Sequence, residues 1–244
     1  MKTVILAGGY GTRLYPLTLD RPKALISISE EKTILDFMWE KITKISTEVF
    51  LISNDKFFHI FDEWRRRRNA KIKILNDGTR NNEERLGAIG DLELLLNIEE
   101  LNEDLLVVGS DNIFDWELKD FVEFSREKQK VTIGLYDVEF LEKAVRFGVV
   151  EVDGDGKVLR MEEKPINPFS TLIGVCIYYF PLSKLFFISE YSRMVREHLK
   201  DAPGFFFSWL YEREEIYGYI CRGKWFDIGT LQSLEEARAY FKDR

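Results

Sequence analysis

A glycine-rich stretch near the start of the chain carries residues that could hold phosphate. It begins at Leu6 and reads LAGGYGTRLYPLTLDRPKAL. Its three glycines permit close approach of the backbone to a ligand and present N–H groups to anionic oxygen. Arg13 adds a planar, forked cation and Lys23 adds a point charge. A tight strand-to-helix turn with surface cations would have the same composition, so the stretch alone leaves both interpretations open.

The spacing of these residues excludes the two commonest phosphate-binding motifs. A P-loop requires G-x-x-x-x-G-K-[ST], and no Lys-Ser or Lys-Thr pair follows the glycines here. The G-x-G-x-x-G pattern of dinucleotide-binding folds is also absent. Any phosphate site in this stretch must therefore be of another kind.

Two later aspartates could bind a divalent cation. Asp111 follows the apolar run LLVVGS, and Asp227 lies within KWFDIGT. Mg²⁺ in proteins is usually held by one or two carboxylates together with substrate phosphates. An aspartate after a strand is also a common turn or helix cap, so each residue taken alone has an ordinary structural explanation.

The elements that must position these residues alternate between strand and helix in the first half of the chain. Short β-branched runs predict strands at 3–7, 48–53, 71–75 and 104–110, and amphipathic runs predict helices at about 33–45, 56–68, 87–98 and 116–128. This alternation is typical of a mostly parallel sheet with helices on both faces. Ligands of such folds bind beyond the carboxyl ends of the strands, where the glycine-rich stretch and Asp111 both fall.

The second half of the chain has a mixed pattern. Residues 147–165 predict a β-hairpin, 171–180 predict a strand, and a closing helix follows residue 230. No linker rich in Pro, Gly or Ser separates the halves. We therefore expect residues 1–244 to form a single domain.

The quoted motifs resemble those of sugar-phosphate nucleotidyltransferases. The stretch GYGTRLYPLTLDRPKAL is similar to the family signature G-x-G-T-R-L-x-P-L-T followed by P-K-A-L, and LLVVGSDNIF, MEEKP and KWFDIGT continue the resemblance in order. The resemblance implies a Rossmann-like α/β fold with a nucleotide-binding half at about 1–130 and a sugar-binding half at about 131–244. It also implies an enzyme that transfers a nucleoside monophosphate from a nucleoside triphosphate to a sugar 1-phosphate.

The resemblance further implies a role for each matching residue. Arg13 and Lys23 would be catalytic, and Asp111 and Asp227 would bind Mg²⁺. The residues that would contact the nucleotide are Leu6, Ala7, Gly8, Gly9, Gly11, Thr12, Arg85 and Gly87. Those that would contact the sugar phosphate are Asn112, Gly148, Glu163, Lys164 and Gly174.

Departures from the family pattern leave the substrates open. Arg85 stands where a glutamine often reads the base, and Leu172 and Ile173 precede Gly174 where a polar residue often contacts the sugar. The first hypothesis is a thymidylyl- or uridylyltransferase acting on glucose 1-phosphate. The alternatives are a nucleotide-sugar-dependent glycosyltransferase and a non-catalytic nucleotide-sensing module.

Composition limits the other partners. The net charge of −7 argues against nucleic acid. No apolar run approaches the ~20 residues that cross a bilayer, and the first residues do not read as a signal peptide, so we expect a cytoplasmic protein without a membrane partner. The expected partners are the two substrates, and self-association into a homo-oligomer is left open.

Overall fold

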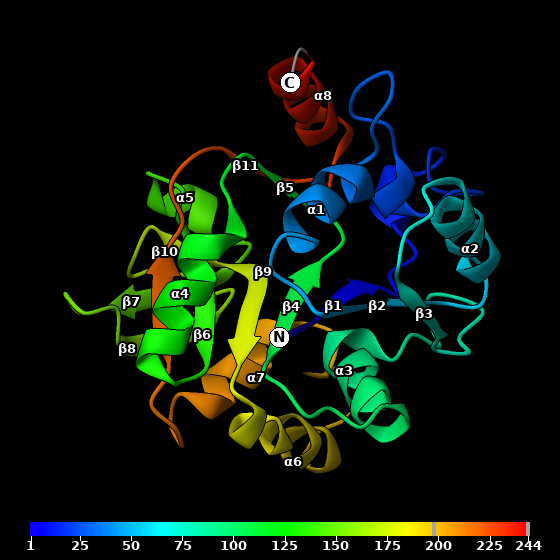
Figure 1. Ribbon diagram of the computed structural model, residues 1–244. Coiled ribbons are helices and arrows are strands. Elements are labelled where there is room, and N and C mark those ends of the chain that lie inside the picture. Colours follow the sequence, from blue (N-terminus) through cyan, green and yellow to red (C-terminus); the bar gives the residue numbers. More distant parts are fainter. Residues whose placement is uncertain (197–198, 243–244) are drawn as a thin grey trace. The chain divides into compact units, whose positions relative to one another are not determined.

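The computed structural model describes residues 1–196 and 199–242, and the chain divides into two compact units (Figure 1). Unit 1 comprises Met1–Leu86, Val108–Glu117 and Gly223–Arg244, and unit 2 comprises Gly87–Val107 and Leu118–Arg222. The fold is α/β with a mixed, mostly parallel sheet, as the sequence predicts.

Unit 1 contains three parallel strands that follow the predicted order. Strand β1 (Lys2–Ala7) pairs with β2 (Glu48–Ser53), and β2 pairs with β3 (Lys73–Asn76). The middle of β1 and β2 is fully buried, which explains why their sequences are continuously apolar rather than alternating. Strand β4 (Leu105–Gly109) ends in unit 1, where the N–H of Ser110 donates to the carbonyl of Leu6 over 3.0 Å.

Two helices follow the first two of these strands. Helix α1 (Ile34–Ile42) begins at a capping box in which the Thr33 hydroxyl accepts from the Asp36 N–H and the Asp36 carboxylate accepts from the Thr33 N–H. Helix α2 (Phe58–Arg67) ends in a run of arginines near the negative end of the helix dipole. Both helices lie close to their predicted positions.

The last part of unit 1 is a short antiparallel pair closed by a helix. Strand β5 (Asn112–Phe114) pairs with β11 (Trp225–Asp227), and helix α8 (Leu231–Phe241) follows (Figure 1). An apolar cluster holds these elements to α1 and to the loop after β1. Its fully or nearly buried members include Leu14, Ile34, Ile113, Ile228 and Leu234.

Unit 2 combines parallel and antiparallel pairing. Strand β6 (Thr132–Asp137) pairs in parallel with β10 (Tyr217–Ile220) and antiparallel with β9 (Leu172–Phe180). Strands β7 (Gly148–Val152) and β8 (Val158–Glu163) form the hairpin that the sequence predicts. The hairpin turn is closed by Asp153, whose carboxylate accepts from the N–H groups of Asp155 and Lys157.

Five α-helices belong to unit 2 among its described residues. They are α3 (Gly87–Ile98), α4 (Leu118–Lys128), α5 (Leu141–Ala144), α6 (Phe186–Met194) and α7 (Pro203–Leu210). Helix α3 begins and ends where the sequence predicts. Three-residue 3-10 turns also occur, at Thr12–Leu14, Lys23–Leu25 and Leu182–Lys184.

Strands β5 and β6 are not among the predicted strands. Strand β6 lies in the sequence VTIGLYDV, whose β-branched residues are themselves a strand signal. Strand β5 has only three residues, and its pairing partner β11 lies more than a hundred residues later, so no local pattern predicts it. The pairing of these short strands is a tertiary event.

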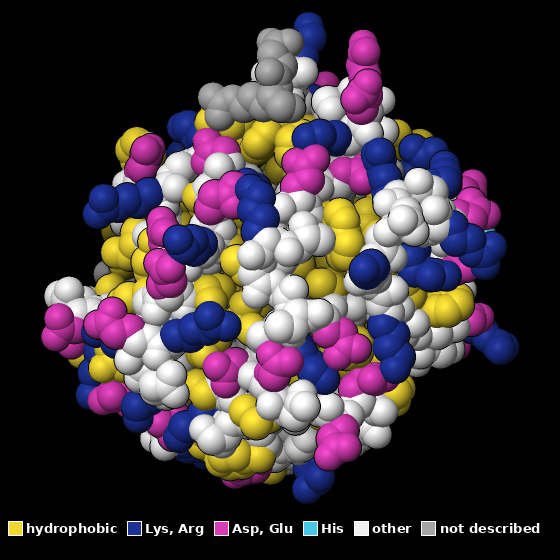
Figure 2. All heavy atoms as spheres, viewed as in Figure 1, with side chains coloured by type: hydrophobic (Ala, Val, Ile, Leu, Met, Phe, Trp, Pro, Cys, Tyr) yellow, Lys and Arg dark blue, Asp and Glu magenta, His cyan; other side chains and the backbone are white. Residues whose placement is uncertain are grey.

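The surface carries charges of both signs. On the face shown in Figure 2, Lys and Arg side chains are interspersed with Asp and Glu side chains. Between residues 1 and 196 and between 199 and 242, no helix is both long and apolar enough to cross a membrane.

Candidate active site

The glycine-rich loop after β1 has a conformation that is fixed by packing and hydrogen bonds. Gly11 adopts φ 64°, a left-handed conformation that favours glycine, and a Cβ there would lie 3.1 Å from the Thr18 methyl carbon. The buried Thr18 hydroxyl donates to the Gly11 carbonyl over 2.7 Å. Gly9 has open space where a Cβ would be. The loop therefore combines one tightly packed glycine with one that leaves its surface accessible.

Two buried side chains that the sequence analysis missed anchor this loop. The Asn54 amide donates to the Gly8 carbonyl over 2.9 Å, and its oxygen accepts from the N–H of Phe57 over 3.0 Å. The hydroxyl of Tyr10 lies 3.0 Å from that of Thr79. Burial raises the pKa of Tyr10. A polar residue directly after a buried strand, as Asn54 is after β2, is the signal that could have identified the first anchor.

The residues before Gly8 face inward. Leu6 and Ala7 are buried at the end of β1, and the Leu6 carbonyl accepts from the Ser110 N–H over 3.0 Å. Thr12 and Arg13 lie in the 3-10 turn that follows Gly11, and both are exposed. The fixed loop thus presents backbone groups and the Arg13 guanidinium at one strand end.

Lys23 and Asp111 form an ion pair in unit 1. The Lys23 Nζ lies 2.9 Å from Asp111 Oδ2, with 15% and 34% of the two side chains exposed. Lys23 begins a 3-10 turn whose next residues, Ala24 and Leu25, are buried, so the backbone that carries the Lys23 side chain is fixed by packing. Although burial disfavours the charged carboxylate, the Lys23 ammonium and the charge of Arg13 hold the pKa of Asp111 below its ordinary value.

Asp227 reaches the same region through strand pairing. In the β5–β11 register Asp227 stands opposite Asn112, the residue after Asp111, and the N–H of Ile228 donates to the Asp111 carbonyl over 2.9 Å. A Cβ placed on Gly229 would lie 3.1 Å from Asp227 Oδ2 and 3.5 Å from Arg13 Nη2. Arg13, Lys23, Asp111 and Asp227 are therefore brought together, although the sequence places them far apart.

This arrangement fits a divalent cation bound together with phosphate. Asp111, directly before β5, and Asp227, on its partner strand β11, supply hard oxygen ligands, and two cations beside them would balance the phosphate charge. No group of three or more His, Cys, Asp and Glu side chains that could hold a metal by itself occurs within residues 1–196 and 199–242. The donor set is thus of the kind that Mg²⁺ shares with substrate phosphates rather than a closed protein cage.

Asn112 is buried, and its side chain is engaged by protein. Its Nδ2 lies 3.4 Å from the Gly109 carbonyl and 3.2 Å from Asp111 Oδ1, and its Oδ1 accepts from Trp225 Nε1 over 2.7 Å. The resemblance implies that this residue contacts the sugar phosphate. In the structure its side chain hydrogen-bonds to Gly109, Asp111 and Trp225, which lie close in sequence to the two aspartates.

In unit 2, the residues predicted to contact sugar phosphate gather at the ends of β7, β8 and β9. Glu163 has 7% of its side chain exposed, and its Oε1 lies 3.2 Å from the Lys164 ammonium, which is 56% exposed. Burial raises the pKa of Glu163, against the opposing charge of Lys164. Gly148 stands opposite Glu163 in the hairpin, and a Cβ on Gly174 would lie 3.8 Å from the Gly148 carbonyl.

Lys164 has an uncommon backbone conformation. Its φ is 48°, in the left-handed region that residues other than glycine rarely adopt. Its N–H donates to the Phe147 carbonyl over 3.0 Å. Such a conformation persists where the surroundings hold it, and it is frequent at functional sites. The constrained backbone of Lys164 therefore fixes the point from which its side chain extends.

Arg85 and Gly87 lie in the segment predicted to read the base. The Arg85 guanidinium donates to the Asn82 carbonyl over 2.7 Å, and the side chain is exposed. Gly87 begins α3 with φ 76°, and a Cβ there would lie 2.6 Å from the Asp201 backbone. The Asp201 backbone therefore leaves no room for a side chain at position 87, which explains the glycine there.

Comparisons with known proteins give one consistent family. The nucleotidyl transferase family profile matches residues 2–244. The bifunctional protein GlmU of Methanocaldococcus jannaschii is 31% identical over 247 residues, which cover 100% of this chain and 55% of that protein. Glucose-1-phosphate adenylyltransferase of Bacillus subtilis is 28% identical, with 96% and 65% covered.

Two further relatives widen the range of named substrates. The catalytic subunit beta of mannose-1-phosphate guanylyltransferase from Drosophila pseudoobscura pseudoobscura is 30% identical, covering 93% of this chain and 59% of that protein. A crystal structure described as a glucose-1-phosphate thymidylyltransferase from Bacillus anthracis superposes with a TM-score of 0.85 at 24% identity, covering 100% of this chain and 96% of that one. The superposition shows the shared fold. The chain spans between about half and two thirds of the length of these curated relatives.

Proposed function

Because the chain belongs to the nucleotidyl transferase family, we propose that it transfers a nucleoside monophosphate from a nucleoside triphosphate to a sugar 1-phosphate. The observation that carries this proposal is the Lys23–Asp111 ion pair, with Asp227 and Arg13 beside it at the end of the glycine-rich loop. Two cations and two carboxylates at a strand end form a site for polyphosphate and a divalent cation.

The proposed reaction needs no general base. A phosphate oxygen of the sugar 1-phosphate attacks the α-phosphorus, the bond from that phosphorus to the α–β bridging oxygen breaks, and pyrophosphate leaves with the electron pair. A phosphate monoester is already an anionic nucleophile near neutral pH. The work left to the protein is to position two polyanions and to stabilise the charge that develops between them.

We assign the two cations of unit 1 to opposite sides of the α-phosphorus. Arg13, exposed in the 3-10 turn after Gly11, would bind the leaving β- and γ-phosphates with its planar fork. Lys23, held 2.9 Å from Asp111, would neutralise the α-phosphate and the attacking oxygen as a point charge. The N–H groups of Gly8, Gly9, Gly11 and Thr12 would donate hydrogen bonds to the remaining phosphate oxygens.

Asp111 and Asp227 would hold Mg²⁺ in this proposal. When bound, the cation would supply charge neutralisation at the α-phosphate. In the structure, Lys23 compensates the charge of Asp111, and Arg13 lies beside Asp227. The Lys23 and Arg13 charges hold the pKa of Asp111 below its ordinary value, so this carboxylate is available to the cation in its ionised form.

The residues of unit 2 are proposed to bind the sugar 1-phosphate. Lys164 would contact its phosphate, and Glu163 would accept a hydrogen bond from a sugar hydroxyl. The support is the constrained Lys164 backbone and the buried Glu163 carboxylate, which has Gly148 opposite it. Gly148 and Gly174 would leave room for the sugar, because neither carries a side chain over that surface.

The proposal also covers the identity of the base and of the sugar. Thymidylyl or uridylyl transfer to glucose 1-phosphate remains the first hypothesis, with Arg85 as the base-reading residue. The relatives named above are described as adenylyl- and guanylyltransferases as well. All common triphosphates therefore belong in the test.

The test is a matrix of ATP, GTP, CTP, UTP and dTTP against glucose, mannose and N-acetylglucosamine 1-phosphates, with phosphocholine as an added acceptor. Released pyrophosphate is measured with Mg²⁺ present. Pyrophosphate that appears only when both substrates are present supports the proposal. Transfer of sugar from a nucleotide-sugar without pyrophosphate would favour a glycosyltransferase, and tight nucleotide binding without turnover would favour a sensing module.

A further inference from the structure

A single buried amide joins the two strands that carry the aspartates. Asn112 is the first residue of β5 and directly follows Asp111, whereas Trp225 is the first residue of β11 and lies two residues before Asp227. The Asn112 side chain accepts from Trp225 Nε1 over 2.7 Å and donates toward Asp111 Oδ1 over 3.2 Å. The amide therefore links the indole of one strand to the carboxylate beside the other.

The orientation of this amide follows from the chemistry of its neighbours. An indole N–H can only donate, so the Asn112 oxygen must face Trp225. The Asn112 NH₂ group then faces Asp111 Oδ1 and the Gly109 carbonyl, both of which accept. Only an amide offers an acceptor and two donors at this length, so neither aspartate nor leucine can make the same set of bonds.

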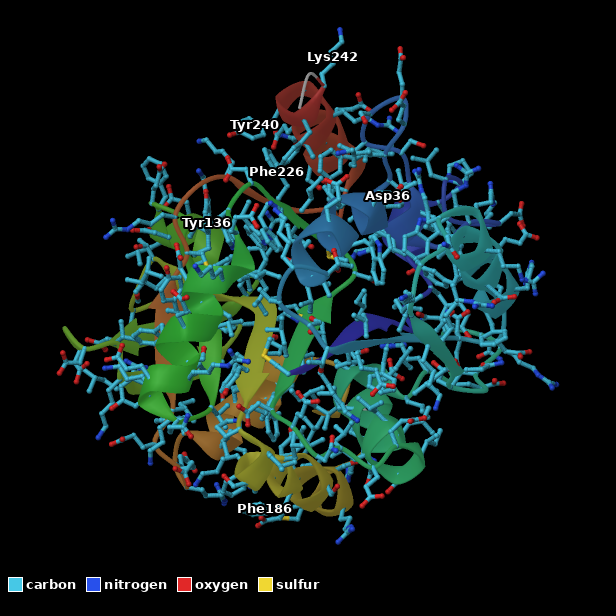
Figure 3. The ribbon with its side chains drawn as sticks, viewed as in Figure 1. Asp36, Tyr136, Phe186, Phe226, Tyr240 and Lys242 are labelled. Atoms are coloured by element: carbon cyan, nitrogen blue, oxygen red, sulfur yellow. The ribbon has the colours of Figure 1, made fainter. Side chains whose placement is uncertain are left out.

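A second attachment fastens the same strand pair at its other end. Asp115 accepts from the N–H of Lys224 over 2.8 Å and from the hydroxyl of Tyr240 over 2.5 Å. Figure 3 shows Tyr240 of α8 next to Phe226 of β11, and the two rings have centroids 5.7 Å apart. The two hydrogen bonds of this attachment run to Asp115, which is not one of the candidate metal ligands.

We propose that Asn112, together with Trp225, is a positioning residue that sets the orientation of the Asp111 carboxylate relative to Asp227 for a divalent cation. The inference rests on the proposed function, because it assumes that the two carboxylates share a cation. Ligand carboxylates are held in place by hydrogen bonds from groups that do not touch the metal, and the loss of such a group weakens metal affinity. Asn112 is such a group for Asp111, because its NH₂ group donates toward Asp111 Oδ1.

The experiment compares two changes that each remove one hydrogen-bond donor near β5 and β11. Trp225→Phe keeps an aromatic ring and removes the indole N–H, and Tyr240→Phe keeps a ring and removes the hydroxyl that reaches Asp115. Asn112→Leu is a stronger variant that removes the amide itself. Binding of Mn²⁺ in the presence of inorganic pyrophosphate is followed by the EPR signal of the free ion, with thermal unfolding recorded for each variant.

We expect Trp225→Phe and Asn112→Leu to raise the Mn²⁺ dissociation constant roughly 10-fold or more. Tyr240→Phe should leave it within about twofold, although both aromatic variants lower the unfolding temperature. Equal metal affinity in wild type and Trp225→Phe would overturn the inference, as would an equal loss in Trp225→Phe and Tyr240→Phe. A wild-type protein that binds no Mn²⁺ would overturn it too, whereas the proposed function is tested separately by pyrophosphate release.

Discussion

At the scale of single residues, the candidate site depends on charges that compensate one another before any substrate binds. Lys23 and Asp111 are 2.9 Å apart in a partly buried setting, and the pKa of Asp111 stays below its ordinary value because Lys23 and Arg13 outweigh the effect of burial. A site that binds polyanions is thus kept from accumulating unpaired positive charge. The same pairing makes Lys23 the most informative residue to change.

Lys23→Ala should lower kcat for pyrophosphate release by roughly 10²-fold or more, because one charge-stabilising donor is lost at the reacting phosphate. Steady-state assays with saturating substrates would measure this effect. Lys44→Ala is the matched control, since that lysine is 59% exposed and pairs with Glu117. Near-normal turnover in Lys23→Ala would remove Lys23 from the mechanism.

Buried carboxylates also join elements to each other, and Asp36 shows this in unit 1. Asp36 lies in the first turn of α1 (Figure 3). Its carboxylate accepts from Trp64 Nε1 of α2 over 3.1 Å and from Nη2 of Arg68, the residue after α2, over 3.0 Å. Burial acts to raise its pKa, but the bonds from Thr33, Arg68 and Trp64 hold the pKa below its ordinary value. One carboxylate therefore caps one helix and ties it to another.

Asp36→Asn should reduce the free energy of unfolding by about 1.5–3 kcal/mol at pH 7, the range for hydrogen bonds to a charged group. Because the folded pKa is depressed, this stabilisation is present above the unfolded pKa of about 3.9 and is lost as pH falls through the folded value. Urea unfolding at pH 7 and at pH 3 would measure the difference. A gap between wild type and variant that stays constant between these pH values would contradict the assignment.

In unit 2, the first turn of α7 sets the place of Glu163. A Cβ on Gly204 would lie 1.7 Å from Glu163 Oε2 and 2.7 Å from its Cδ, so this carboxylate packs directly on the helix backbone. Gly204→Ala should displace Glu163 and lower kcat/KM for the sugar 1-phosphate roughly 10- to 100-fold, with KM for the triphosphate little changed.

Gly154→Ala is the control for that variant. Gly154 lies in the β7–β8 turn and has nothing within 4 Å of a Cβ. Kinetics with each substrate varied in turn would separate the two KM values. An equal rise of both KM values in Gly204→Ala would point to general disruption instead of a role in sugar binding.

At the scale of the whole molecule, the net charge is −7 although the proposed substrates are polyanions. In the proposed site the positive charge they need is local, because Arg13 and Lys23 would act at contact distances where the solvent screens little. The β5–β11 pair is held by Asn112, Trp225 and Asp115 through hydrogen bonds within the protein. We therefore expect the fold of unit 1 to be independent of the proposed cation.

Removal of divalent cations with EDTA should abolish pyrophosphate release and leave the unfolding temperature within about 2 °C. Proteins whose folding free energy comes from a structural metal lose their fold on chelation, and this chain should not. Calorimetry with and without EDTA, followed by addition of Mg²⁺, would measure both properties. A large drop in unfolding temperature would indicate a structural metal, and undiminished turnover in EDTA would exclude the proposed use of Mg²⁺.

The sequence by itself determined the elements that local patterns encode. The predicted strand at 48–53 and the predicted helix at 87–98 have the bounds of β2 and α3, because continuous apolar runs and helical periodicity are local properties. The glycine spacing and the motifs around Asp111 and Asp227 also pointed to the family that the comparisons then gave. Roles assigned from the motifs alone remain predictions.

Only the tertiary structure decided which of these residues meet. The three-residue strands β5 and β11 are too short to be stable alone and pair across more than a hundred residues, so Asp227 reaches Asp111 only in the folded chain. The motif predicts that Asn112 contacts the sugar phosphate, and only the folded chain shows that its side chain is buried and accepts from Trp225 Nε1. Local sequence encodes local structure, whereas a site built from distant segments exists only once burial and pairing have brought them together.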